Sequence, residues 1–285
     1  MTTFPIVLVH GIARFDILAE ILRNKFPGVF PAEQLQYFRG IKPHLEARGF
    51  TVSHPNQSFA GSVDLRAEQL RARINDILST SSSPKVHLIA HSMGGLDARH
   101  MIVDHGMADK VASLTTIGTP HHGSPVANQL VKGSVLLKVL DRVLDVDGVA
   151  DLTTSACEQF NSRAEEAEAK NAVFYQTYSA SENLNLVFAP LIPLWILVRE
   201  QEGRNDGVVS VRSQQWAKEL IAVDGTRHSI VQREFPFPAD HFNEVGWWDP
   251  NEVSLFGGGI VKQARNFEQK VRDLYLQIAQ GLQDS

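Results

Sequence analysis

The chain has 285 residues and a formal net charge of −5, and its apolar and charged contents are ordinary for a globular protein. Its length allows a large core and lies at the upper edge for a single domain. No basic stripe that could neutralise phosphates is present, which argues against nucleic acid as a partner. Cys157 is the only cysteine, so an intramolecular disulfide is excluded.

The N-terminal stretch does not have the pattern of a signal peptide. Residues 4–9 form a short apolar run with no basic residue before it. The location therefore stays open between the cytoplasm, export by another route and a mature exported form.

The first half of the chain alternates predicted strands and helices. Residues 5–10 form an apolar strand that leads into His10-Gly11-Ile12. A helical pattern with apolar residues at 35, 38, 41 and 45 ends near Gly49, a C-cap glycine. The next elements are a short strand at 50–53, a helix at 63–78, a buried strand from 86, a helix from 96 and a strand at 111–117. This order implies a mostly parallel sheet that binds ligands at the carboxyl ends of its strands.

The stretch from residue 85 to residue 95 reads K-V-H-L-I-A-H-S-M-G-G. It combines a buried strand, a turn of small residues, Ser92 and the start of a helix. That order places the serine hydroxyl on a strained elbow at the carboxyl edge of the sheet. The usual elbow is G-x-S-x-G, and Ala90 stands here in place of the first glycine. A small residue still meets the need of the turn, because a larger Cβ would crowd the helix behind it.

The regular pattern breaks between residues 121 and 168. Within this stretch, residues 135–146 are strongly amphipathic. We interpret them as a lid over the active site, with a helix packed on the core as the alternative. The chain is therefore predicted to form a single domain, residues 1–285, with a lid or cap insertion at residues 121–168.

The second half of the chain returns to recognisable elements. Residues 172–179 predict a strand. The almost wholly apolar residues 184–198 are too short for a membrane span of ~20 residues and contain two prolines. We interpret them as a wall of the substrate cleft, with a buried core segment as the alternative. A tight turn at residues 205–207 precedes strand-like residues 208–211, and residues 260–282 predict an amphipathic helix that closes the sheet.

Ser92 needs a histidine to take its proton and a carboxylate to orient that histidine. An elbow serine of this kind is followed in the chain first by the acid and then by the base. His241 lies in the loop before the closing helix and is the preferred base. His228 lies in a polar stretch that reads as exposed. His121 and His122 come too early in this order and are interpreted as structural or lid-hinge residues.

The preferred acid is Asp206, which follows a strand and the cleft-forming segment. Asp224 and Asp240 are also candidates for this role. Asp240 is too close in sequence to His241 to face its ring.

An oxyanion needs two preorganised backbone N–H donors. One is expected from Met93, the residue after the nucleophile, where a helix begins and the N–H is unpaired. The other is expected from Ile12, in the loop after the first strand. His10, His91 and Arg66 could support the site from behind, or serve as ordinary structural polar groups.

Five motifs that span nearly the whole chain together resemble one family. They are P-I-V-L-V-H-G, V-H-L-I-A-H-S-M-G-G, G-T-P-H-H-G-S, N-D-G-V-V-S and D-H-F-N-E-V, in this order. The joint pattern resembles the bacterial triacylglycerol lipases, an α/β-hydrolase family. The resemblance implies an α/β-hydrolase fold, a mostly parallel central sheet flanked by helices, with an inserted helical lid. It also implies the triad Ser92, Asp206 and His241 and the oxyanion pair Ile12 and Met93.

Some residues depart from the family pattern. The loop after His10-Gly11 is long, and Arg14 stands where a glycine often stands. Many members hold a structural Ca²⁺ partly by an aspartate two residues after the catalytic histidine, and Asn243 occupies that position here. Without carboxylates the affinity for Ca²⁺ should be low. We therefore predict no metal and no cofactor, with a weak Ca²⁺ site near Asn243 as the alternative.

The sequence thus predicts a serine hydrolase that cleaves carboxylic esters through an acyl-enzyme. A triacylglycerol lipase acting on medium-to-long acyl chains at a lipid–water interface is the first expectation. A carboxylesterase or polyester hydrolase acting on shorter or soluble esters is the alternative. A catalytically silent acyl-binding protein would not need the complete set of serine, aspartate and histidine. No transmembrane segment is predicted, and the oligomeric state stays open.

Overall fold

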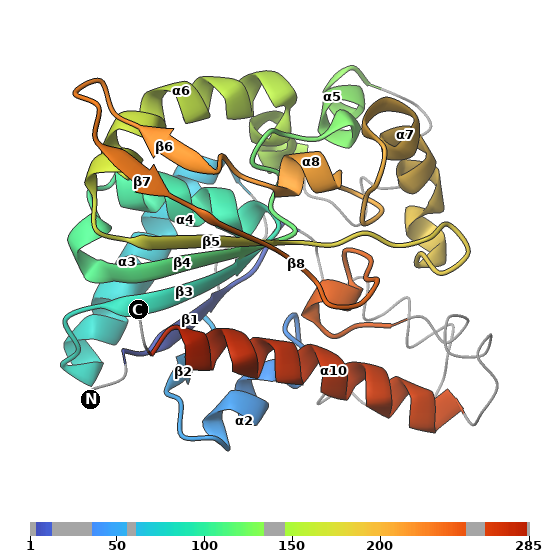
Figure 1. Ribbon diagram of the computed structural model, residues 1–285, viewed down its shortest axis with the longest axis horizontal. Helices are drawn as coiled ribbons and strands as arrows, with labels where there is room; N and C mark the ends of the chain where they lie inside the picture. Colours follow the sequence, from blue (N-terminus) through green and yellow to red (C-terminus); the bar gives the residue numbers. More distant parts are fainter. Residues whose placement is uncertain (1–3, 13–35, 56–60, 134–145, 249–259, 284–285) are drawn as a thin grey trace.

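The computed structural model describes residues 4–12, 36–55, 61–133, 146–248 and 260–283. Six parallel strands form the central sheet in the order β2-β1-β3-β4-β5-β8 (Figure 1). These strands are β1 Ile6–Val9, β2 Val52–Ser53, β3 Val86–His91, β4 Val111–Ile117, β5 Phe174–Ser179 and β8 Val231–Glu234. A separate antiparallel pair consists of β6 Glu219–Ile221 and β7 Arg227–Ser229.

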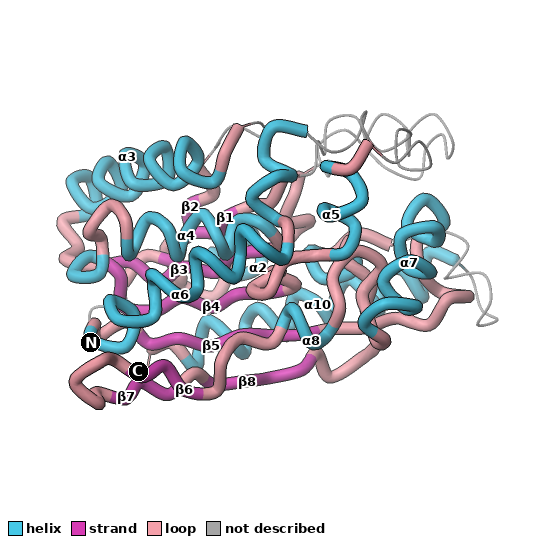
Figure 2. Tube along the Cα trace, turned by 90° about the horizontal axis from the view of Figure 1, so that it is seen from above, coloured by secondary structure: helices cyan, strands magenta, loops and turns pink. Residues whose placement is uncertain are grey.

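Helices cover both faces of the sheet. The α-helices are α2 Ile41–Glu46, α3 Val63–Ser81, α4 Met93–Val103, α5 Pro125–Val131, α6 Thr154–Lys170, α7 Ile192–Glu202, α8 Val211–Gln214 and α10 Ile260–Gly281. Short 3₁₀ segments are η2 Ala108–Lys110, η4 Val146–Leu152, η5 Ala189–Leu191 and η6 Asn243–Val245. Figures 1 and 2 show α3, α4 and α6 on one side of the sheet and α2 and α10 on the other. Among the described helices, none combines the length and the apolar character that crossing a membrane requires.

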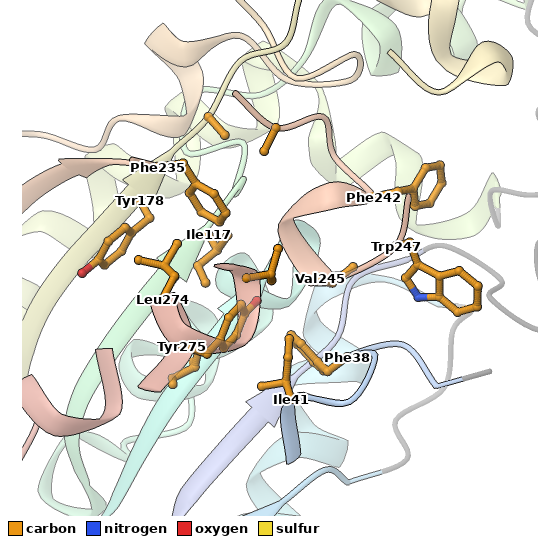
Figure 3. Packing of buried hydrophobic residues seen from close by; sticks show 14 of the residues in the cluster. Phe38, Ile41, Ile117, Tyr178, Phe235, Phe242, Val245, Trp247, Leu274 and Tyr275 are labelled. Carbon is orange, nitrogen blue, oxygen red and sulfur yellow. The ribbon is translucent and has the colours of Figure 1, made fainter. Parts of the chain in front are cut away.

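Strand β1 is wholly apolar because both of its faces are buried. In β1, Ile6 and Leu8 belong to the core cluster that includes α2 and α10, while Val7 and Val9 belong to the cluster beneath α3 and α4. Successive strand residues point to opposite faces, so one short run supplies two cores. In the first cluster the ring of Tyr275 lies against that of Phe38, with centroids 6.2 Å apart (Figure 3).

The candidate site lies where the order of the strands in the sheet reverses direction. The chain passes from β1 to β2 on one side and then returns to β3 on the other side of β1. A crevice outside the carboxyl ends of the strands is expected where the order reverses in this way. His10-Gly11 leaves β1 and Ser92 leaves β3 at this edge.

The main predicted elements are present. The strands expected at 5–10, 111–117 and 172–179 correspond to β1, β4 and β5, and the helices expected at 63–78 and 260–282 correspond to α3 and α10. The helix expected from residue 35 begins only at Ile41, because Gly40 has the left-handed φ of 67°. Strand β8 and helix α6 were not predicted.

The strand expected at residues 208–211 was a wrong prediction. The Asp206 side chain accepts the backbone N–H groups of Val208 and Val209 at 2.8 and 2.7 Å. These donors are therefore engaged locally instead of in a ladder with a neighbouring strand. Only an isolated bridge joins Asn205 to Ser210, and α8 begins at Val211.

The proposed lid helix, residues 135–146, lies outside the described residues except for Val146, so it stays a prediction, as do the limits 121–168 of the insertion. The rest of that stretch contains α5, η4 and α6. Helix α6 is tied to α4 by the buried ion pair of Glu168 with Arg99, whose two nitrogens lie 2.8 and 2.9 Å from the carboxylate oxygens. The guanidinium of Arg99 also stacks on Trp216, 4.0 Å from its ring centre.

The substitution Glu168→Gln should lower the free energy of unfolding by about 3–5 kcal/mol, because it leaves the buried charge of Arg99 without its partner. Glu158→Gln, an exposed glutamate on the same helix, is the matched control and should change it by less than about 0.5 kcal/mol. Urea unfolding followed by circular dichroism measures both. Equal effects of the two substitutions would contradict the anchoring role of the pair.

Candidate active site

The backbone at Ser92 is strained. Its φ of 57° and ψ of −134° lie in a region that residues other than glycine seldom adopt. Strand β3 ends at the preceding residue and α4 begins at the following one, so the side chain stands at the tip of a sharp turn. This geometry matches the elbow predicted from the sequence.

Two glycines allow α4 to begin directly against the sheet. A Cβ atom at Gly94 would lie 2.6 Å from the carbonyl oxygen of His10 and 2.8 Å from that of Val9. A Cβ atom at Gly95 would overlap the side chain of Thr119. Both positions therefore require the absence of a side chain.

The structure brings Ser92, His241 and Asp206 together. The Nε2 atom of His241 lies 2.9 Å from the Oγ of Ser92, and its Nδ1 lies 2.8 Å from the Oδ2 of Asp206. The backbone N–H of His241 also donates to the backbone carbonyl of Asp206 at 2.8 Å. Strands β3, β5 and β8 precede these residues in the chain, and loops at the carboxyl edge hold them side by side.

The buried carboxyl groups around His241 differ in the groups that they contact. The Oδ2 of Asp206 also accepts from the amide of Gln214 at 3.0 Å, and its Oδ1 accepts two backbone N–H groups. The neighbouring Glu244 is fully buried and its Oε1 has no hydrogen-bond partner in the described part of the chain. Burial first, and then the charges of Asp206 and Asp240, raise the pKa of Glu244 well above its ordinary value.

As the sequence predicted, Asp240 does not face the imidazole ring of His241. Its carboxylate contacts backbone N–H groups instead. It accepts the backbone N–H groups of Phe188, Phe242 and Asn243 at 2.7 to 2.9 Å. Burial raises the pKa of Asp240 to about 7.

The remaining candidates for the acid and the base lie away from Ser92. Asp224 is exposed and pairs with Lys170, whose Nζ lies 3.0 Å from its carboxylate. His228 lies on β7 with its ring 5.2 Å from that of Tyr175. His121 is buried and makes hydrogen bonds to Thr116 and Arg99, which is a structural role. His122 is exposed.

The two predicted oxyanion donors lie beside each other. Ile12 and Met93 belong to one small apolar cluster with Val149 and Cys157. Within the described residues, the backbone N–H groups of Ile12 and Met93 have no hydrogen-bond partner. Both are thus available to an oxygen atom near Ser92.

Polar groups behind the site include the three that the sequence suggested. Arg66 binds Asp97 through both carboxylate oxygens and donates to the carbonyl of His10 at 3.0 Å. The Nε2 of His91 lies 2.9 Å from the Oε2 of Glu244. Sequence reasoning missed Glu244, although it lies in the D-H-F-N-E-V motif, and it missed Tyr37, which no motif contains.

A narrow apolar pocket opens onto Ser92 and His241. Its free volume is about 60 Å³. The lining consists of Ile12, Ser92, Pro120, Ser124, Val126, Ala127, Leu130, Val149, Leu152, Leu191, Leu194, Val208, Val209, His241 and Phe242. Two of these residues, Leu191 and Leu194, belong to the segment 184–198 that was predicted to form a wall of the cleft. Leu194 and Val198 are also part of the buried core, so both interpretations of this segment apply.

A larger polar cavity of about 520 Å³, lined by residues of α6 and α8, contains neither Ser92 nor His241.

The side chain of Asn243 is already engaged. Its amide oxygen accepts the backbone N–H of Asp240 at 3.0 Å, and its amide nitrogen donates to the carbonyl of Trp247 at 2.9 Å. This oxygen therefore does not point outward as a calcium ligand would.

His91, His241 and Glu244 offer ligand atoms within 4.8 Å of one another, but the ring nitrogens of both histidines already have partners. The absence of a metal stays a prediction.

Comparison with known proteins identifies the class. Residues 5–234 match the family model described as alpha/beta hydrolase fold. Triacylglycerol lipase 2 of Saccharomyces cerevisiae is 30% identical over 250 residues, which cover 75% of each chain. A triacylglycerol lipase of Vibrio cholerae is 39% identical over 134 residues, which are 47% of this chain and only 38% of that relative.

Solved structures share the fold. A metagenomic carboxyl esterase superposes with a TM-score of 0.66 at 15% identity, covering 99% of this chain and 76% of that one. Lipase 1 from Pelosinus fermentans superposes with a TM-score of 0.61 at 17% identity, covering 98% of this chain and 99% of that one.

The chain therefore belongs to the α/β-hydrolase fold family. The predicted fold, the resemblance to triacylglycerol lipases and the predicted class of enzyme, a carboxylic ester hydrolase, are confirmed.

The substitution Gly94→Ala should lower the free energy of unfolding by about 1–3 kcal/mol, because the new Cβ meets backbone carbonyl groups that cannot move aside. Gly281→Ala, in α10 with no atom near the new Cβ, should be neutral or stabilise by up to about 1 kcal/mol. Thermal and urea unfolding compare the two. A Gly94→Ala protein as stable as the parent would contradict the close contact between α4 and β1.

Proposed function

We propose that the protein is a lipase that hydrolyses acylglycerol esters, with Ser92 as nucleophile, His241 as base and Asp206 as the orienting acid. The observation that carries this proposal is the continuous hydrogen-bonded series from Ser92 through His241 to Asp206 at the mouth of an apolar pocket. The names of the yeast and bacterial relatives, all triacylglycerol lipases, support the same substrate class.

The mechanism follows from these contacts. As the Oγ of Ser92 attacks the ester carbonyl, its proton moves to the Nε2 of His241. Asp206 accepts the Nδ1–H and stabilises the imidazolium. The negative charge that develops on the carbonyl oxygen is bound by the N–H groups of Ile12 and Met93. The imidazolium then protonates the leaving alcohol, which leaves an acyl group on Ser92.

Deacylation repeats the same steps with water. His241 takes a proton from the water molecule that attacks the acyl-enzyme, and it returns this proton to the Oγ of Ser92 as the acid departs. The neutral form of His241 is needed at the start of each half-reaction. Three donors other than the ring itself hold the carboxylate of Asp206 in place, so it keeps the ring in one orientation throughout.

A second candidate function is an esterase acting on shorter or soluble esters. The free volume of about 60 Å³ beside Ser92 is well below the roughly 300–1,000 Å³ of typical ligand pockets. A short acyl group needs less space than a long one. The apolar lining still favours the lipase, because each buried CH₂ group contributes about 0.8 kcal/mol.

Replacing the nucleophile tests the site. Ser92→Ala should lower kcat by about 10⁶-fold, and Asp206→Asn by about 10⁴-fold, because the amide favours the wrong tautomer of His241. Asp224→Asn, at an exposed aspartate far from the serine, is the matched control and should leave kcat unchanged. Hydrolysis of p-nitrophenyl butyrate gives these values. An active Ser92→Ala protein would refute the assignment of Ser92 as nucleophile. An impaired Asp224→Asn protein together with a fully active Asp206→Asn protein would assign the role of the acid to Asp224.

The acyl chain-length profile separates the two candidate functions. For the lipase, kcat/KM should rise from acetate to at least the octanoate p-nitrophenyl ester and increase again on emulsified triacylglycerol, because longer chains bury more apolar surface. For the esterase, the rate should peak at butyrate or below and show no gain at an interface. The same preparation should be measured below and above the solubility limit of each ester.

A further inference from the structure

Side chains form hydrogen bonds with the backbone of the loop that carries one proposed oxyanion donor. We call this loop, residues 10–12, the oxyanion loop. The carbonyl of His10 accepts from Arg66 at 3.0 Å, and the N–H of Gly11, the other end of the same peptide unit, donates to the hydroxyl of Tyr37 at 2.9 Å. In the next unit, the carbonyl of Gly11 accepts from the Nδ1 of His10 at 2.9 Å. Peptide units are planar, so these contacts together set the direction of the Ile12 N–H.

Tyr37 is the first member of a buried chain of hydrogen bonds. Its hydroxyl accepts from Gly11 and lies 2.7 Å from the Nδ1 of His91, whose Nε2 lies 2.9 Å from the Oε2 of Glu244. Neutral His91 with its proton on Nε2 satisfies both of its contacts, accepting from Tyr37 and donating to Glu244. Burial lowers the pKa of His91 well below its ordinary value and raises that of the Tyr37 hydroxyl, so both groups stay uncharged.

This chain connects the three segments on which the reaction depends. Gly11 precedes Ile12, His91 precedes Ser92, and Glu244 lies three residues after His241. The spacing is tight, because a Cβ atom at Gly11 would lie 2.7 Å from the Cβ of Ser92 and 2.8 Å from the Tyr37 hydroxyl. The contact with Tyr37 therefore helps to set how far the oxyanion loop stands from the nucleophile.

We propose that Tyr37 and His91 are positioning residues. They hold the oxyanion loop at the distance and orientation from Ser92 and His241 that the reaction needs. The proposal rests on the ester hydrolysis proposed above. Tyr37 acts through the Gly11 N–H and does not itself bind the oxyanion. Loss of its hydroxyl frees one end of the His10–Gly11 peptide unit, which weakens binding of the transition state more than binding of the ester.

The substitution Tyr37→Phe tests the proposal, with Tyr275→Phe as the matched control. Tyr275 is also buried, and it donates its hydroxyl to the backbone carbonyl of Glu244 at 3.1 Å instead of to the oxyanion loop. On p-nitrophenyl butyrate, Tyr37→Phe should lower kcat about 10- to 100-fold, somewhat less than removal of an oxyanion donor itself, with KM within about threefold of the parent. Phosphonylation of Ser92 by a p-nitrophenyl alkylphosphonate ester, which releases p-nitrophenol, should slow by a similar factor. Tyr275→Phe should keep both rates.

A second pair of variants tests the positioning role if the Tyr37→Phe protein does not fold. The side-chain oxygen of an asparagine lies roughly where the Nδ1 of a histidine lies, so His91→Asn keeps an acceptor for Tyr37, whereas His91→Gln does not. His91→Asn should therefore retain several times more kcat than His91→Gln.

The outcomes are distinct. A folded Tyr37→Phe protein with the kcat of the parent, an equal loss in Tyr275→Phe, or equal activities of the two His91 variants would overturn the positioning role while the parent still cleaves esters. A parent that cleaves no ester and reacts with no phosphonate would instead overturn the proposed function, and this inference with it.

Discussion

The strained backbone of Ser92 is the constraint on which the rest of the site depends. A serine with a φ of 57° costs about 1–3 kcal/mol, and it persists because β3 on one side and α4 on the other are both fully packed. The turn can be this sharp only if α4 begins in contact with the end of β1, which is why Gly94 can bear no side chain. The same contact brings the oxyanion loop close to Ser92, so the strain, the packing and the geometry of the site have one cause.

Around His241, three carboxyl groups share one buried region and differ in the groups that they contact. Asp206 accepts from the Nδ1 of His241, Asp240 accepts three backbone N–H groups, and Glu244 accepts from the Nε2 of His91. Among the described carboxyl groups, Asp206 is the one within hydrogen-bond distance of the Nδ1 of His241, while burial raises the pKa of Glu244 well above its ordinary value.

Apolar periodicity predicted the elements whose stability comes from burial. Strands β1 and β4 and helices α3 and α10 were all visible because regular apolar spacing reflects which faces meet the core. The prediction failed where side-chain hydrogen bonds replace regular backbone pairing, as at residues 208–211 beside Asp206. Helix α6 was missed because its buried face carries Ala164 and the ion-paired Glu168 beside Cys157 and Phe160, so its apolar spacing is weak.

The sequence by itself determined the elbow at Ser92 and the resemblance to the family, since these depend on residue types at fixed local spacing. Only the tertiary structure decided which carboxylate faces His241 and which polar groups hold the oxyanion loop. Tyr37 lies 54 positions before His91, and Glu244 lies 153 positions after it. Hydrogen bonds between residues so far apart arise from how the sheet brings its carboxyl ends together, and no local pattern in a single chain encodes them.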